Sequence, residues 1–213
     1  MKILVALAPA LFLAQAFATE APAPASAAAE ATNAHRYLIE RTFPAGALAG
    51  LDAASKAKVN ANNASVGVHW VKSYANADET KTFCVYEGPS EAAVRQAATL
   101  NALPIDSVTE VPVAVDYDAA AGAKSAAASH RYLVERTFAS GSADKTDAAH
   151  KAKVNAVNAR FGVRWVTSYD NAAKTRSYGL YEGPTEAAVR DAAGANGMSV
   201  DRISEVPVTL LPN

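Results

Sequence analysis

The feature that most constrains this chain is a run that occurs twice, as His35-Arg36-Tyr37-Leu38-Ile39-Glu40-Arg41-Thr42-Phe43 and again from His130 to Phe138. The two runs differ only where Val134 replaces Ile39. A gap-free alignment of the chain with itself extends from the His35/His130 pair to the Val113/Val208 pair, with about 46 identities over roughly 79 positions, far beyond chance. The chain is therefore a tandem duplication of one small domain.

The segment before the first copy has the pattern of a secretory signal. Lys2 supplies a positive charge, residues 3–17 are almost wholly apolar, and Ala16-Phe17-Ala18 has the small-x-small pattern of a signal peptidase site. The apolar run is short for a membrane span. We expect a signal peptide over 1–18 and a periplasmic or secreted product that no longer contacts the membrane. An amphipathic or buried N-terminal helix is the alternative.

Composition sets the remaining boundaries. Residues 19–33 are rich in alanine and proline and lack large apolar side chains, so we expect a disordered tether. We place the first repeat at 34–113, a linker at 114–129 and the second repeat at 130–210. Each repeat is small for an independent core, which favours a monomer whose two repeats pack together as an internal pseudo-dimer.

Charge and cysteine content exclude several classes of protein. The chain has 20 basic and 21 acidic residues, mixed along its length, so no basic block indicates a nucleic-acid surface. Cys84 is the only cysteine, so the chain has no intramolecular disulfide. An exported product must then depend on its core or on the pairing of its repeats.

Each repeat alternates β-rich runs with alanine-rich helical stretches. In the first repeat we predict strands over 37–43, 66–74, 82–87 and 107–113. Asp52 is placed to cap a helix that runs to about Asn63, and Ser90 to cap a second helix over Glu91–Leu100. The order β-α-β-β-α-β is the split arrangement of a ferredoxin-like fold.

Helices in this fold cover one face of the sheet, so the other face needs apolar cover. An identical neighbouring domain can supply it, and the linker is long enough to let two sheets stack. We therefore predict an α+β protein in which two ferredoxin-like repeats stack sheet to sheet as a pseudo-dimeric α+β barrel.

Period-two alternation divides the strand residues between two faces. We assign the more apolar set to the helix side: Tyr37, Ile39, Val68, Trp70, Phe83 and Val85. The space between the sheets would then receive the polar set: Glu40, His69, Ser73 and Cys84, with Glu135, Arg164, Ser168 and Gly179 from the second repeat. A cavity that mixes carboxylate, imidazole, thiol and guanidinium groups suits a small polar ligand or a metal ion.

Each of these residues also has a structural interpretation. Glu40-Arg41, repeated as Glu135-Arg136, can be ordinary ion pairing on a strand surface. A lone His69 can be an edge residue, and Cys84 can be a small buried hydrophobe. The second repeat has Arg164 and Gly179 at the positions of His69 and Cys84, so a site built on these two would be single and asymmetric.

Several motifs together resemble a known family. Residues 37–43, 68–74, 81–90 and 103–111 are similar to a small bacterial domain family, long labelled as of unknown function and now often called nickel-responsive-protein-like. The resemblance covers both repeats. It implies a ferredoxin-like domain that dimerises through its sheets, with nickel bound in a few members. It implies as metal ligands His69, Cys84 and Glu40.

The sequence thus favours an exported, non-catalytic protein that binds a small polar ligand, or nickel or another divalent transition metal, between its repeats. The alternative is a small α+β-barrel enzyme, oxygenase-like or isomerase-like, with His69 as base and Arg164 stabilising an anionic intermediate. Fold analogy alone supports the enzyme, since no Ser-His-Asp pattern or glycine-rich phosphate loop appears.

Overall fold

A computed structural model describes residues 34–116, 130–139 and 147–213. They belong to one compact unit, Asn33–Asn213. The expected signal peptide and tether, and residues 117–129 of the expected linker, lie outside the described residues. Residues 114–116, which were expected in the linker, belong to a strand instead. Within the described part, we find no helix with the length and apolar character needed to cross a membrane.

Both repeats have the predicted β-α-β-β-α-β order. The first contains β1 (His35–Thr42), α1 (Ala53–Ala64), β2 (His69–Ala75), β3 (Lys81–Gly88), α2 (Glu91–Leu100) and β4 (Ser107–Glu110). The second contains β6 (His130–Thr137), α3 (Ala148–Ala159), β7 (Arg164–Asp170), β8 (Arg176–Gly183), α4 (Glu186–Ala195) and β9 (Arg202–Glu205). A short additional strand comes at the end of each repeat, β5 (Val113–Asp116) after β4 and β10 (Val208–Leu210) after β9.

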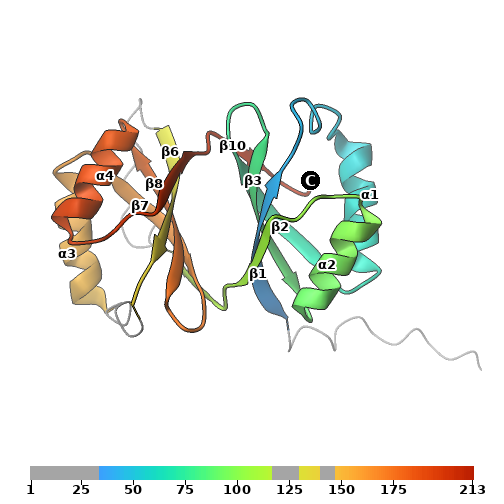
Figure 1. Cartoon of the computed structure of the whole chain (residues 1–213), viewed down its shortest axis with the longest axis horizontal. Helices are drawn as coiled ribbons and strands as arrows, with labels where there is room; N and C mark the ends of the chain where they lie inside the picture. Colours follow the sequence, from blue (N-terminus) through green and yellow to red (C-terminus); the bar gives the residue numbers. More distant parts are fainter. Residues whose placement is uncertain (1–33, 117–129, 140–146) are drawn as a thin grey trace, which may run out of the picture. The chain divides into compact units, whose positions relative to one another are not determined.

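The helices begin at the predicted caps. The Asp52 side chain accepts a hydrogen bond from the backbone N–H of Ser55 at 2.8 Å, and the Ser90 hydroxyl accepts one from Ala93 at 3.2 Å. Each cap satisfies a backbone donor that has no partner inside the helix. In Figure 1, α1 and α2 cover one face of their sheet, and α3 and α4 cover one face of theirs.

The repeats exchange their last strands. The sheets have the orders β10-β2-β3-β1-β4 and β5-β7-β8-β6-β9, so β5 pairs with β7 of the second repeat and β10 pairs with β2 of the first. The strand predicted over 107–113 is therefore two strands, β4 and β5. Pro112, which has no N–H to donate, separates them.

The faces without helices pack against each other. Residues from both sheets form one buried cluster: Leu38, Tyr74, Phe83, Val85 and Val111 with Leu133, Tyr169, Tyr178, Leu180 and Val206. The hydroxyls of Tyr74 and Tyr169, which occupy equivalent positions in the two repeats, lie 3.2 Å apart in this cluster. The predicted sheet-to-sheet pseudo-dimer is confirmed.

The assignment of strand faces was only partly right. Tyr37, Ile39, Val68 and Trp70 lie on the helix side as predicted. Phe83 and Val85, assigned to the same side, instead face the other sheet. The register explains this, because Ile39 pairs with Cys84 and Leu38 with Val85, and directly paired residues share a face.

A β-bulge in β2 explains why Ser73, which was expected between the sheets, lies on the helix side. The register of β2 against β3 shifts between Trp70 and Lys72, and that of β7 against β8 shifts between Trp165 and Thr167. One extra residue reverses the alternation of all the residues that follow it. After the bulge Ser73 pairs with Cys84 on the helix side, and Tyr74 pairs with Phe83 between the sheets.

The strand exchange leads to a test by truncation. A chain that ends at Pro207 lacks β10, and we expect it to lose about 3 kcal/mol of unfolding free energy, from the packing of Leu210 and the ladder hydrogen bonds to β2. Urea denaturation measures the loss. A chain that ends at Leu211 keeps the strand and is the control. Equal stability of the two truncations would contradict the importance of the exchanged strand.

Candidate functional site

Four of the residues expected between the sheets lie on the helix side instead. Ser73 and Ser168 each accept a hydrogen bond from the indole N–H of a tryptophan, Trp70 at 2.9 Å and Trp165 at 2.8 Å. Cys84 is buried in the helix-side core of the first repeat, and Gly179 is its equivalent in the second. The prediction that these residues line the inter-sheet space is wrong, for the reasons of register and bulge given above.

His69 and Arg164 lie at the edge of the inter-sheet face. His69 is exposed and pairs in register with Glu87. Arg164 pairs with Glu182, and its Nη2 lies 2.7 Å from Glu182 Oε2. The expectation that the repeats enclose His69 is wrong, because β2 begins at this edge and leaves the side chain exposed, whereas Arg164 is half-buried.

The expected metal ligands do not form one site. Glu40 lies between the sheets, Cys84 lies on the opposite face of β3, and His69 pairs four residues along β3 from the partner of Glu40, roughly 13 Å away at the rise of a strand. Among the described residues, no group of three or more His, Cys, Asp or Glu side chains is placed to hold a metal ion. A nickel site built from His69, Cys84 and Glu40 therefore does not fit this structure.

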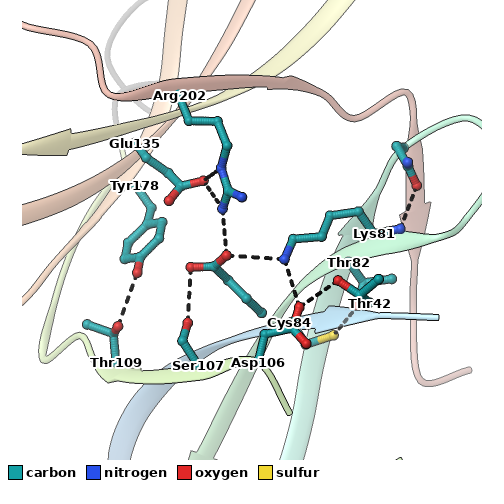
Figure 2. Close-up of polar contacts among 12 residues, drawn as sticks. Thr42, Lys81, Thr82, Cys84, Asp106, Ser107, Thr109, Glu135, Tyr178 and Arg202 are labelled. Atoms are coloured by element: carbon teal, nitrogen blue, oxygen red, sulfur yellow. Dashed lines mark hydrogen bonds and ion pairs between the residues drawn. The ribbon is translucent and has the colours of Figure 1, made fainter. Parts of the chain in front are cut away.

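Glu40 and Glu135, in contrast, lie where expected, and together they are the centre of a charged cluster between the repeats. Their side chains are only 7% and 8% exposed. Arg202 of β9 bridges them: its Nη2 donates to Glu40 Oε2 at 2.5 Å, and its Nε donates to Glu135 Oε1. Figure 2 shows the Arg202 guanidinium beside Glu135, with Ser107 and Lys81 completing the network.

Two further cations complete the cluster. Lys81 Nζ lies 3.3 Å from Glu40 Oε2, and Arg176 Nη2 lies 3.5 Å from Glu40 Oε1 and 3.7 Å from Glu135 Oε2. Lys81 also contacts Asp106 at 2.9 Å. Basic side chains of the chain itself thus neutralise both carboxylates. A divalent cation could bind the carboxylates only by displacing these basic side chains.

The cations around Glu40 lower the pKa of its carboxyl group. Burial raises the pKa of Glu40. Hydrogen bonds from Arg202 and Ser107 and the charges of Arg202 and Lys81 together lower it by more, so the pKa lies below its ordinary value of 4.5. Glu40 therefore remains a carboxylate at neutral pH and holds the cations of both repeats.

Sequence reasoning missed Lys81, Arg176 and Arg202. Lys81 and Arg176 are equivalent positions that keep a basic residue, which is a usable signal. Arg202 corresponds to Ser107, which donates to Glu40 Oε1 at 3.0 Å. Only the packing of the two sheets brings all of these side chains to the same carboxylates.

A pocket lies elsewhere, between the helices and the sheet of the first repeat. Its cavity volume is about 50 Å³, and it is partly open to solvent. Most of its lining is apolar, and Leu210 of the exchanged strand β10 contributes to it. The residues with polar or sulfur atoms in the lining are Arg41, Trp70, Ser73, Thr82, Cys84 and Tyr86.

Comparison with known proteins gives one family. The model of a family described as "Nickel responsive protein SCO4226-like" matches residues 37–111 and again 132–206. The crystal structure of SCO4226 from Streptomyces coelicolor A3(2) matches with 23% identity and a TM-score of 0.33, over 37% of this chain and 96% of that one. A search of curated proteins found no match.

Two other solved structures match over most of the chain. A putative monooxygenase from Lactobacillus acidophilus NCFM is 11% identical with a TM-score of 0.42, over 84% of this chain and 93% of that one. Chlorite dismutase from Candidatus Nitrospira defluvii, in complex with imidazole, is 8% identical with a TM-score of 0.41, over 84% and 91%.

The charged cluster leads to a stability test. We expect Glu40→Gln to lower the unfolding free energy at pH 7 by about 2–4 kcal/mol, because it removes the buried carboxylate that Lys81, Arg176 and Arg202 contact. Because the folded pKa of Glu40 is lowered, the wild-type advantage is present above pH 4.5 and is lost as the pH falls through the folded pKa.

Urea denaturation at pH 7 and pH 3 measures both effects. The control is Glu110→Gln, which changes an exposed carboxylate that contacts His35 and should shift stability by less than about 0.5 kcal/mol. An equal effect of the two substitutions would show that the cluster does not stabilise the fold.

Proposed function

The chain belongs to the SCO4226-like family of nickel-responsive proteins, and we propose that it is an exported, non-catalytic binding protein that takes a small ligand into the pocket of its first repeat. The observation that carries this proposal is the contrast between two spaces. Between the sheets, aromatic and aliphatic side chains form a buried cluster, and the carboxylates at this contact are neutralised by cations of the chain itself. The helix-side pocket has empty volume, access to solvent and a buried arginine.

The placement of the candidate catalytic residues supports a non-catalytic role. A general base must lie within hydrogen-bond reach of a bound substrate, and His69 is exposed at the edge of a sheet, away from the residues that line the pocket. Arg164 is paired with Glu182. Neither side chain is positioned to act on a molecule held in the pocket.

Export is proposed from the sequence of residues 1–18, which has the charge, the apolar run and the small-x-small site of a signal peptide. Mass spectrometry of the protein recovered from the periplasm or medium tests this. Cleavage after Ala18 predicts a product that begins at Thr19. A product that keeps Met1–Ala18 would contradict it.

Nickel is the second candidate ligand, and the family description is what favours it. The described residues offer imidazole and carboxylate only as pairs, His35 Nδ1 with Glu110 Oε1 and His130 Nδ1 with Glu205 Oε1, each at 2.6 Å. A competent nickel site usually has three or more protein ligands. The structure therefore favours a non-metal ligand over nickel.

Isothermal titration of tag-free protein with Ni²⁺ tests this choice. We expect no stoichiometric binding tighter than about 10 μM, and the same result for His69→Ala, since two-ligand sites on an exposed surface hold a metal weakly. Stoichiometric binding that is lost in His35→Ala and His130→Ala would support nickel as the ligand instead.

The pocket itself is tested by filling it. Leu103 lines the pocket, and Met198 is its equivalent in the second repeat. We expect Leu103→Trp to abolish the binding of neutral and charged single-ring compounds detected by ligand-observed NMR, while Met198→Trp retains it. Equal binding by both variants would show that the compounds bind outside this pocket.

A further inference from the structure

We infer that the pocket of the first repeat binds a small organic carboxylate with an apolar body, whose charged end is held by Arg41. This inference rests on the proposed function and names the chemical class of the ligand. Three observations carry it: the burial of Arg41 without a countercharge, the different solution found in the second repeat, and the shape of the pocket.

Arg41 is a buried cation with incomplete partners. It is 2% exposed, its Nη1 donates to the carbonyl oxygen of Pro104, and its guanidinium lies 5.7 Å from the centre of the Tyr86 ring. Its Nε has no hydrogen-bond partner, which is also true of Arg136 Nε in the second repeat. None of the ion pairs found among the described residues involves Arg41. A buried charge is costly unless it is paired, so a bound anion would stabilise this site.

The second repeat has its own carboxylate near the equivalent arginine. Arg136 is 3% exposed, and both Arg136 and Asp170 pair in register with Ser177 of β8, so the two side chains share a face of the sheet. The charge of Arg136 lowers the pKa of Asp170, but burial raises it by more, so the pKa lies above its ordinary value. The residue at this position in the first repeat is Ala75. An internal carboxylate therefore accompanies the cation in one repeat and is missing in the other.

The shape of the two sites differs at the position of Cys84. In the second repeat this position is Gly179, and a Cβ atom there would lie 2.6 Å from Cε2 of Tyr181 and 3.2 Å from Nη1 of Arg136. Tyr181, stacked on Trp165, thus occupies the space that a side chain would take. Cys84 prevents Tyr86 from adopting the same position, which keeps space open beside Arg41.

The rest of the lining selects the body of the ligand. Apart from the residues near Arg41, the wall is formed by Phe43, Leu48, Leu51, Val59, Leu103 and Leu210. Such a wall favours an apolar group by the area that it removes from water. The small volume limits this group to a short acyl chain or a single ring. A carboxylate supplies two oxygens that match the donors of a guanidinium.

The sole cysteine gives a direct probe of the site. Iodoacetate carries a carboxylate, and iodoacetamide is its neutral analogue. In either reaction the thiolate of Cys84 attacks the CH₂ carbon, a sulfur–carbon bond forms, iodide leaves with the bonding pair, and the thiol proton goes to solvent. We expect the ratio of the iodoacetate rate to the iodoacetamide rate to be at least about tenfold higher at Cys84 than at free cysteine, the value of one charge-assisted hydrogen bond.

Matched variants separate the role of Arg41 from a structural one. Arg41→Met should return the ratio to that of free cysteine, whereas Arg136→Met, the same change in the second repeat, should leave it raised. Ala75→Asp keeps Arg41 and introduces the carboxylate of the second repeat, so it should also abolish the raised ratio. This variant tests the inference even if Arg41→Met does not fold. A wild-type ratio equal to that of free cysteine, or a raised ratio in Arg41→Met, overturns the inference.

Protection by added ligands distinguishes this inference from the proposed function. Benzoate should slow the alkylation of Cys84 by iodoacetamide, and benzamide should slow it at least tenfold less effectively. Equal protection by the two compounds would retain a small-molecule pocket and overturn the choice of a carboxylate. No protection by either compound would overturn the pocket itself.

Discussion

The structure depends on one constraint: each repeat covers only one face of its sheet with helices. The other face is apolar and needs a partner, and the duplication places that partner in the same chain. Burial of Leu38 and Leu133 and the residues around them, at about 2–3 kcal/mol for each large side chain, holds the sheets together. The charged cluster and the exchanged strands form only because this contact exists. Leu210, which lines the pocket of the first repeat, likewise comes from a strand that follows the second.

The two repeats differ at two positions that decide how their buried charges are compensated. Ser107 corresponds to Arg202, and the arginine neutralises the glutamates of both repeats. Ala75 corresponds to Asp170, so the buried arginine of the second repeat has an internal carboxylate nearby and that of the first does not. In a symmetric homodimer these differences cannot arise, because every substitution appears on both sides. Duplication allows the two repeats to differ in the surroundings of equivalent buried arginines, one of which lines a pocket in the first repeat.

Much of the fold could be predicted from the sequence, since the caps at Asp52 and Ser90, the order of elements and the stacking of the sheets follow from local patterns that the structure confirms. The faces of the strands could be predicted only in part, because both faces of each sheet are buried and hydrophobicity does not distinguish them. The bulge at Val71 leaves no mark in the alternation, yet it moves Ser73 to the other side. Glu40 and Glu135 were placed correctly, but their cations come from distant strands and only the packed sheets bring them together.

The exchanged strand β10 also sets an order of assembly. The sheet of the first repeat lacks its outer strand until residues 208–210 are available. If the chain folds as it emerges from its N-terminus, β2 therefore remains an open edge until the whole second repeat has followed. Early local contacts can form, but the non-local pairing that completes the sheet comes last, and such pairing is intrinsically slow. The sheet of the first repeat is thus complete only after residues 208–210 have paired with β2.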